Sequence, residues 1–208
     1  NPLVWSTVMI RAEAARALDP FQRPAMNFAE DFDLYHRLAP LGRIARIDDV
    51  LLTYRRHGGG ASQRHVAAMR ARAIDVLAAD YAALFEEEEE AEGAATLIVR
   101  HVMGGEPVPD RATFARLGET LIALQDDFLT RRAPGRQDRA LIRWETARRW
   151  AKVARAGLRT GHLNLGDAAR TRPDHLGLGY AGIDELVLSR LVGGARAAQR
   201  RLSDRIAR

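Results

Sequence analysis

The chain has 208 residues, of which 47% are hydrophobic and 28% are charged. This composition excludes collagen-like and wholly disordered proteins, and the length is sufficient for one or two domains. The absence of cysteine excludes disulfide bonds and thiolate metal sites. The chain begins at Asn1 without an initiator Met, so we expect it to be a piece of a longer protein.

Charge is distributed unevenly along the chain. The formal net charge is +5, but residues 1–130 carry a net −6 and residues 131–208 carry a net +11. Such an asymmetry indicates an anionic partner for the C-terminal part. The charge by itself does not choose between a lipid, a nucleic acid and a phosphorylated substrate.

The first 62 residues have a mixed pattern. Residues 13–18 are expected to form one or two helical turns, and apolar residues recur at helical spacing over residues 30–39, where Pro40-Leu41-Gly42 ends the helix. Runs rich in β-branched and aromatic residues predict three short strands, at residues 4–10, 43–46 and 50–54. Three consecutive glycines, Gly58 to Gly60, form a break after the last strand.

The pattern beyond Ser62 is helical throughout. Apolar stripes predict four helices, at residues 66–84, 114–128, 138–158 and 188–202. The stripe of the last helix consists of Leu188, Leu191, Ala195, Ala198 and Leu202. We expect these stripes to pack against one another or against the first 62 residues. The glutamate run at residues 86–90 is expected to be a solvated helix end or a loop.

Two adjacent carboxylates, Glu30 and Asp31, lie at the start of the helix predicted over residues 30–39. Asp31 falls on the edge of the apolar stripe, from which it could face a cleft. A carboxylate in the first turn is also stabilised by the helix dipole, so a capping role accounts for either acid alone. Asp33 and Arg37 are expected to form an ordinary exposed ion pair.

A second candidate cluster, Tyr54-Arg55-Arg56-His57, ends a predicted strand. A histidine at such a position can reach a ligand or a metal, and it can equally be an exposed loop residue. The other histidines do not have metal-ligand spacing. The glycine pattern of residues 177–182 matches a dinucleotide-binding fingerprint in letters only, because it follows turn residues instead of a strand.

The order of these features resembles family 2 glycosyltransferases. The resemblance is carried by residues 1–11, then Ala29-Glu30-Asp31-Phe32-Asp33-Leu34-Tyr35, then Arg37-Leu38-Ala39, and finally residues 50–57, which read VLLTYRRH. These segments are similar to the second half of that family's GT-A catalytic domain. Their order and spacing agree over about 60 residues, and no such resemblance covers the helical remainder.

The resemblance implies an inverting transfer of a sugar from a nucleotide-sugar donor to an acceptor hydroxyl. By position, Asp31 would be the general base, and Glu30 would help to hold the acceptor. His57 would approach a divalent ion, Mn²⁺ or Mg²⁺, and the diphosphate, with Arg55 beside it on the cofactor side. The metal is expected in the intact enzyme and not on this chain alone.

Two departures from the family pattern affect what the chain can do. Residues 18–24 replace the glycine-rich stretch that usually precedes the Glu-Asp motif. The half of the GT-A domain that binds the nucleotide and supplies the D-x-D metal motif is also missing, since the letters Asp31-Phe32-Asp33 belong to the Glu-Asp helix. We therefore expect this chain to be inactive by itself.

The sequence thus predicts an α+β fold that is predominantly α. Residues 1–62 would form the C-terminal half of a GT-A domain with a partial sheet of about three short strands, and residues 63–208 a helical extension. The expected partners are a nucleotide-sugar donor and a carbohydrate or lipid-linked acceptor. The unpaired strand edges are expected either to be covered by the helices or to pair with a second copy of the chain. The alternative function is a basic helical module that binds anionic membranes, with specific nucleic-acid binding less favoured. Either function places the protein in the cytoplasm or at the inner face of the membrane.

Overall fold

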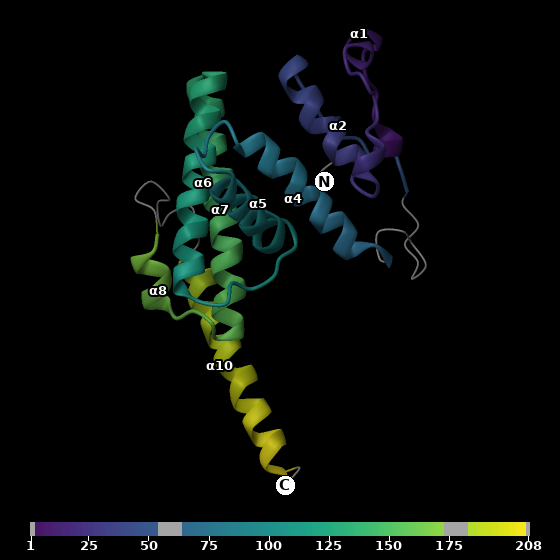
Figure 1. Cartoon of the computed structure of the whole chain (residues 1–208). Helices are drawn as coiled ribbons and strands as arrows, with labels where there is room; N and C mark the ends of the chain where they lie inside the picture. Colours follow the sequence, from purple (N-terminus) through teal and green to yellow (C-terminus); the bar gives the residue numbers. More distant parts are fainter. Residues whose placement is uncertain (1–2, 54–63, 173–182, 207–208) are drawn as a thin grey trace. The chain divides into compact units, whose positions relative to one another are not determined.

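The computed structural model describes residues 3–53, 64–172 and 183–206 (Figure 1). The chain divides into two compact units, Asn1–Ala95 and Thr96–Arg208. The described ranges are helical and contain no β-strand, which confirms the predominantly α prediction. The domain boundary expected after residue 62 falls in residues 54–63, outside the described part of the chain.

The first unit is built around a pair of packed helices. α2 (Glu30–Leu38) packs against α4 (Val66–Tyr81) and against the short 3₁₀ turns on either side of it, η2 (Pro24–Met26) and η3 (Ala39–Leu41). Two shorter elements precede them, η1 (Trp5–Thr7) and α1 (Ala12–Arg16). α2 begins and ends as the sequence predicts, because Pro40 lacks the amide hydrogen that would continue the helix.

The predicted partial sheet is wrong for the described residues. Residues 4–10 contain the 3₁₀ turn η1, and neither residues 43–46 nor residues 50–53 form a strand. A strand is stable only when another strand satisfies its backbone amides and carbonyls, and no described segment provides one. The apolar side chains that suggested a sheet are consequently exposed, including Met9 at 97% and Val50 at 93% of full exposure. The strand edges expected to cause self-association are therefore not formed.

The second unit is a helical assembly. α6 (Arg111–Arg132) and α7 (Arg136–Thr160) lie side by side and antiparallel, joined by a three-residue turn in which Ala133 has φ +42° (Figure 1). Phe114 of α6 and Trp150 of α7 form the centre of the core, with ring centroids 5.2 Å apart. α5 (Glu88–Leu97), which crosses the boundary between the units, continues into the π-helical segment η4 (Ile98–Met103), and η4 packs on α7.

The final helix, α10 (Ile183–Ile206), packs on α7 through small residues. Among the side chains of α10 that the structure describes, Leu186, Ser189 and Gly193 are buried, whereas Leu188 and Leu191 are 60% and 64% exposed. The part of the predicted apolar stripe whose side chains the structure describes, Leu188, Leu191 and Ala195, is thus not the packing face of the helix. A β-carbon on Gly193 would lie 2.6 Å from the carbonyl oxygen of Leu158, so the two helices approach too closely for a larger residue at this position.

A short helix, α8 (Leu165–Arg170), follows α7 and packs on α10. The residues of α10 after Gly193 extend past the C-terminus of α7 (Figure 1). None of the helices in the described ranges is long and apolar enough to cross a membrane.

Candidate active site

The two carboxylates that the sequence nominates for catalysis lie in the first turn of α2, and both are half-buried. The N-cap residue is Ala29, whose methyl side chain cannot accept a hydrogen bond. Asp31 instead accepts a hydrogen bond from the backbone N–H of Phe32, with an N···Oδ1 distance of 2.7 Å. This contact satisfies one amide of the first turn, as the capping alternative requires, and it orients the Asp31 carboxylate.

The third acid of this turn, Asp33, is structural, and the expectation that its pair with Arg37 is exposed is wrong. Asp33 is only 2% exposed, and its Oδ2 lies 2.9 Å from Nε and 2.8 Å from Nη2 of Arg37. Arg37 also donates to the backbone carbonyls of Pro20 and Phe21, at 2.8 and 2.9 Å. A buried carboxylate requires such a partner, and the pair ties the loop before α2 to the helix.

Tyr35 lies one helical turn after Asp31, on the same face of α2. The residue is 8% exposed, and its hydroxyl is buried without a hydrogen-bond partner. Burial raises the pKa of the Tyr35 phenol, and the negative charge of Asp31 raises it further. The ring of Trp5 lies beside it, with centroids 6.2 Å apart. α2 therefore brings residues of two of the separate segments that carry the family resemblance close together around Tyr35.

The backbone immediately before the Glu-Asp pair has an unusual conformation. Phe28 has φ +74°, a left-handed value that is uncommon for a bulky residue. Its ring stacks on the imidazole of His65, with centroids 4.2 Å apart and planes 17° apart. Strain of this kind persists only where surrounding contacts hold it, and it occurs often beside functional sites. Here the stacking fixes the direction from which the chain enters α2.

The second candidate cluster cannot be placed. Arg55 and His57 both fall in residues 54–63, outside the described part of the chain. Within residues 3–53, 64–172 and 183–206, no group of three or more His, Asp or Glu side chains could hold a metal ion. The metal implied by the family resemblance therefore has no ligand set among the described residues, and no step is assigned through it.

Two features of this site escape the sequence reasoning. Nothing in the spacing of residues 30–39 shows that the hydroxyl of Tyr35 lacks a partner. Phe28 has an ordinary residue type, and a positive φ at a residue other than glycine gives no signal in a sequence. No protein-family model, curated protein or solved structure matches the chain.

Proposed function

We propose that the chain is the acceptor-side part of an inverting glycosyltransferase that resembles family 2 and transfers a sugar from a nucleotide-sugar donor to an acceptor hydroxyl. The observation that supports this proposal best is the half-buried Glu30–Asp31 pair at the start of α2. The orphaned phenol of Tyr35 lies one helical turn after Asp31, and the ring of Trp5 lies beside Tyr35. A site for a polar acceptor needs a carboxylate beside hydrogen-bonding groups that the protein itself leaves unsatisfied.

Asp31 acts as the general base in this proposal. Its carboxylate takes the proton of the acceptor hydroxyl while that oxygen forms a bond to the anomeric carbon of the donor. The bond from this carbon to the diphosphate breaks at the same time, and the nucleoside diphosphate leaves from the opposite face. Glu30 accepts a hydrogen bond from the acceptor and orients it. A divalent ion, when bound, would offset the negative charge that develops on the leaving group.

The test requires the longer protein, in which this chain is joined to the sequence that precedes Asn1. Release of nucleoside diphosphate from a nucleotide-sugar is measured with Mn²⁺ or Mg²⁺. Asp31→Asn is expected to lower the rate by about 10²- to 10⁴-fold, the usual contribution of a general base. Asp75→Asn is the matched control, since Asp75 lies on α4 in an exposed ion pair with Arg72 and should leave the rate unchanged.

A purely structural role for Asp31 would give a different result. Loss of a capping contact would accelerate hydrogen exchange across α2 and leave the rate of transfer by the folded protein intact. Full activity of Asp31→Asn would therefore overturn the proposed role of this residue. Loss of activity with unchanged exchange in α2 would support it.

A second candidate function, contact with an anionic membrane, is supported by the exposed face of α10. Val187, Leu188 and Leu191 share one side of this helix and are 40%, 60% and 64% exposed. The same C-terminal part of the chain carries the net charge of +11. A helix with exposed leucines in a basic region can lie in the interface of an anionic bilayer. The two functions are compatible, and they are distinguishable because Asp31→Asn should not alter membrane binding.

A further inference from the structure

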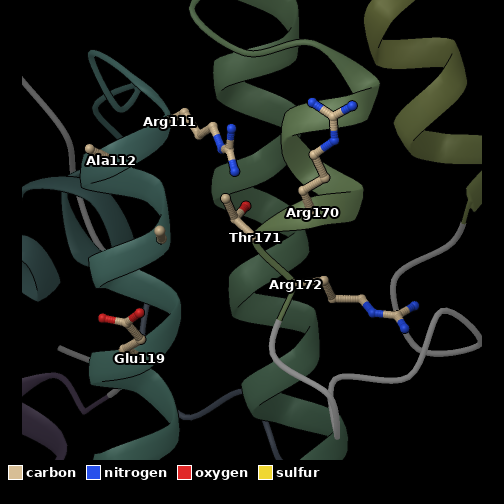
Figure 2. Close-up of a pocket in the computed structure, with 7 residues that line it drawn as sticks. Arg111, Ala112, Glu119, Arg170, Thr171 and Arg172 are labelled. Atoms are coloured by element: carbon tan, nitrogen blue, oxygen red, sulfur yellow. The ribbon is translucent and has the colours of Figure 1, made fainter.

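The second unit contains an open pocket of about 740 Å³ between the first turns of α6 and the end of α8 (Figure 2). Arg111, Ala112, Ala115 and Glu119 of α6 form one wall. Arg170, Thr171 and Arg172 form the other. The volume lies within the range of small-molecule sites. Three of the seven lining residues are arginines, and only one is acidic.

The arginines of the pocket are not ion-paired with the described residues. None of Arg111, Arg170 and Arg172 forms an ion pair with any residue in the described ranges, because the nearby acids Asp110 and Asp167 are engaged in the caps of α6 and α8. The Nε of Arg172 is buried and lacks a hydrogen-bond partner. A buried guanidinium nitrogen without an acceptor is costly, so this wall of the pocket contains an unsatisfied donor.

The two walls are held in place by contacts away from the pocket. His162, just after α7, donates from Nδ1 to the carbonyl oxygen of Val108, just before α6, over 2.8 Å. The neighbouring Leu163 is buried against Gly157 of α7. α8 is closed at its N-terminus by a reciprocal capping box between Asn164 and Asp167. The pocket is therefore formed by fixed backbone, and the arginine side chains are its adjustable part.

The backbone amides at the start of α6 are already in use. Asp110 accepts a hydrogen bond from the N–H of Thr113 at 2.7 Å, and this bond holds the pKa of Asp110 below its usual value. An anion in the pocket would thus be held by guanidinium groups and not by the helix N-terminus. Arg111 reaches from α6 toward Thr171, whereas Arg170 and Arg172 extend in other directions (Figure 2). Arg170 is exposed and free to turn toward an anion beside Arg111.

Glu119 lies on the same wall as Arg111, about 12 Å further along the helix axis at 1.5 Å per residue. Its carboxylate would repel a second phosphate and would accept hydrogen bonds from hydroxyl groups. This arrangement disfavours diphosphates and nucleic-acid backbones, whose charge continues in both directions. It matches a ligand with one charged end and one hydroxyl-bearing end.

We propose that this pocket binds a soluble phosphate monoester that carries hydroxyl groups, with its phosphate at Arg111 and Arg170 and its hydroxyls toward Glu119. Guanidinium groups match phosphate oxygens in geometry and remain charged at all physiological pH values. The hydroxyl of Thr171 donates to the carbonyl of Asp167 over 2.7 Å, so its oxygen remains able to accept. The site is independent of the carboxylates of α2.

The test is isothermal titration calorimetry on the whole chain, with glucose 6-phosphate, inorganic phosphate and pyrophosphate as probes. Glucose 6-phosphate is expected to bind more tightly than the other two. Arg111→Gln and Arg170→Gln should each weaken its binding about tenfold or more, because each removes a charged hydrogen bond. Arg136→Gln is the matched control, since Arg136 is the first residue of α7, as Arg111 is of α6, and lies outside the pocket.

Glu119→Gln separates the two ends of the site. It should reduce the preference for glucose 6-phosphate over pyrophosphate and leave the binding of inorganic phosphate at least as strong. The proposal is overturned if no probe binds at low salt, or if Arg136→Gln weakens binding as much as Arg111→Gln. It is also overturned if only vesicles that contain phosphatidic acid bind, because the site would then belong to a lipid surface.

Discussion

At the scale of single residues, the acids of α2 divide by their surroundings. Asp33 is buried and hydrogen-bonded to Arg37, so its negative charge is neutralised in a structural ion pair. Asp31 is half-buried one turn before the unpartnered phenol of Tyr35. Removal of Arg37 would leave the buried Asp33 charge with only the longer contact to Arg23, 3.4 Å from Nη1 to Oδ1, at a cost of up to about 3–5 kcal/mol. The same run of three acids within four positions therefore contains one fully buried structural group, Asp33, and two half-buried ones, Glu30 and Asp31.

Tyr35 gives a pH-dependent prediction. Its pKa in the folded chain is raised above the ordinary value of 10.0 by burial and by Asp31. Below about pH 10 the phenol is neutral in both states, so its contribution to stability is constant. As pH rises through the unfolded value and then the folded one, the unfolded chain releases the proton first, and stability falls.

Tyr35→Phe should remove this alkaline loss. At neutral pH it should change the free energy of unfolding by no more than about 1 kcal/mol, and in the stabilising direction, because the buried hydroxyl loses no hydrogen bond. Both effects are measured by urea unfolding at a series of pH values, with the exchange of the α2 amide hydrogens as the local probe. Tyr81→Phe on α4 serves as the control and should keep the alkaline loss. An unchanged pH profile in Tyr35→Phe would contradict the assignment.

At the scale of elements, helical periodicity predicted where helices occur better than which face they bury. α2, α4, α6, α7 and α10 all lie where apolar spacing placed them. On α10, however, Leu186, Ser189 and Gly193 are buried in place of the leucine stripe. Small residues allow two backbones to approach, and a scheme based on hydrophobic spacing gives them no weight. The close approach to α7 therefore determines which face of α10 is buried.

The strands failed for a different physical reason. β-Branched and aromatic residues indicate a chain that fits a sheet, but a sheet also requires a neighbouring strand. The sequences of residues 4–10 and 43–53 do not by themselves show whether such a neighbouring strand exists. The candidate site was only partly predictable for a similar reason. Spacing located Glu30 and Asp31, whereas the burial of Asp33 and the orphaned hydroxyl of Tyr35 depend on contacts with the preceding loop and Trp5.

The α7–α10 crossing gives a prediction with a closely matched control. In Gly193→Ala, the new β-carbon would meet the carbonyl oxygens of Leu158 and Arg159 at 2.6 and 2.9 Å. These are backbone atoms, so the helices must separate, at a cost of about 1–3 kcal/mol. In Gly194→Ala the β-carbon meets nothing within 4 Å, and alanine should stabilise the helix by up to about 1 kcal/mol. Urea unfolding followed by circular dichroism measures both, and equal stability of the two variants would contradict the close crossing.

At the scale of the whole molecule, the chain separates its carboxylate site from its basic region. The Glu30–Asp31 pair belongs to the first unit, and the net charge of +11 lies in residues 131–208 of the second. The excess positive charge is far along the sequence from the carboxylates proposed to act on a sugar acceptor. We therefore relate this charge to membrane binding and not to the sugar-transfer step. The exposed leucines of α10 are the residues through which membrane binding can be tested.

Sedimentation with vesicles tests the membrane prediction. The chain should bind vesicles that contain phosphatidylglycerol and not pure phosphatidylcholine, and binding should weaken as salt increases. Replacing Leu188 and Leu191 together by serine should lower the partition coefficient by at least tenfold, since each leucine contributes about 1.5 kcal/mol or more when its exposed surface enters the bilayer. Leu141→Ser is the control, because Leu141 is 62% exposed on α7, outside the predicted contact face. An equal effect of Leu141→Ser, or equal binding to vesicles with and without phosphatidylglycerol, would contradict the proposed contact through α10.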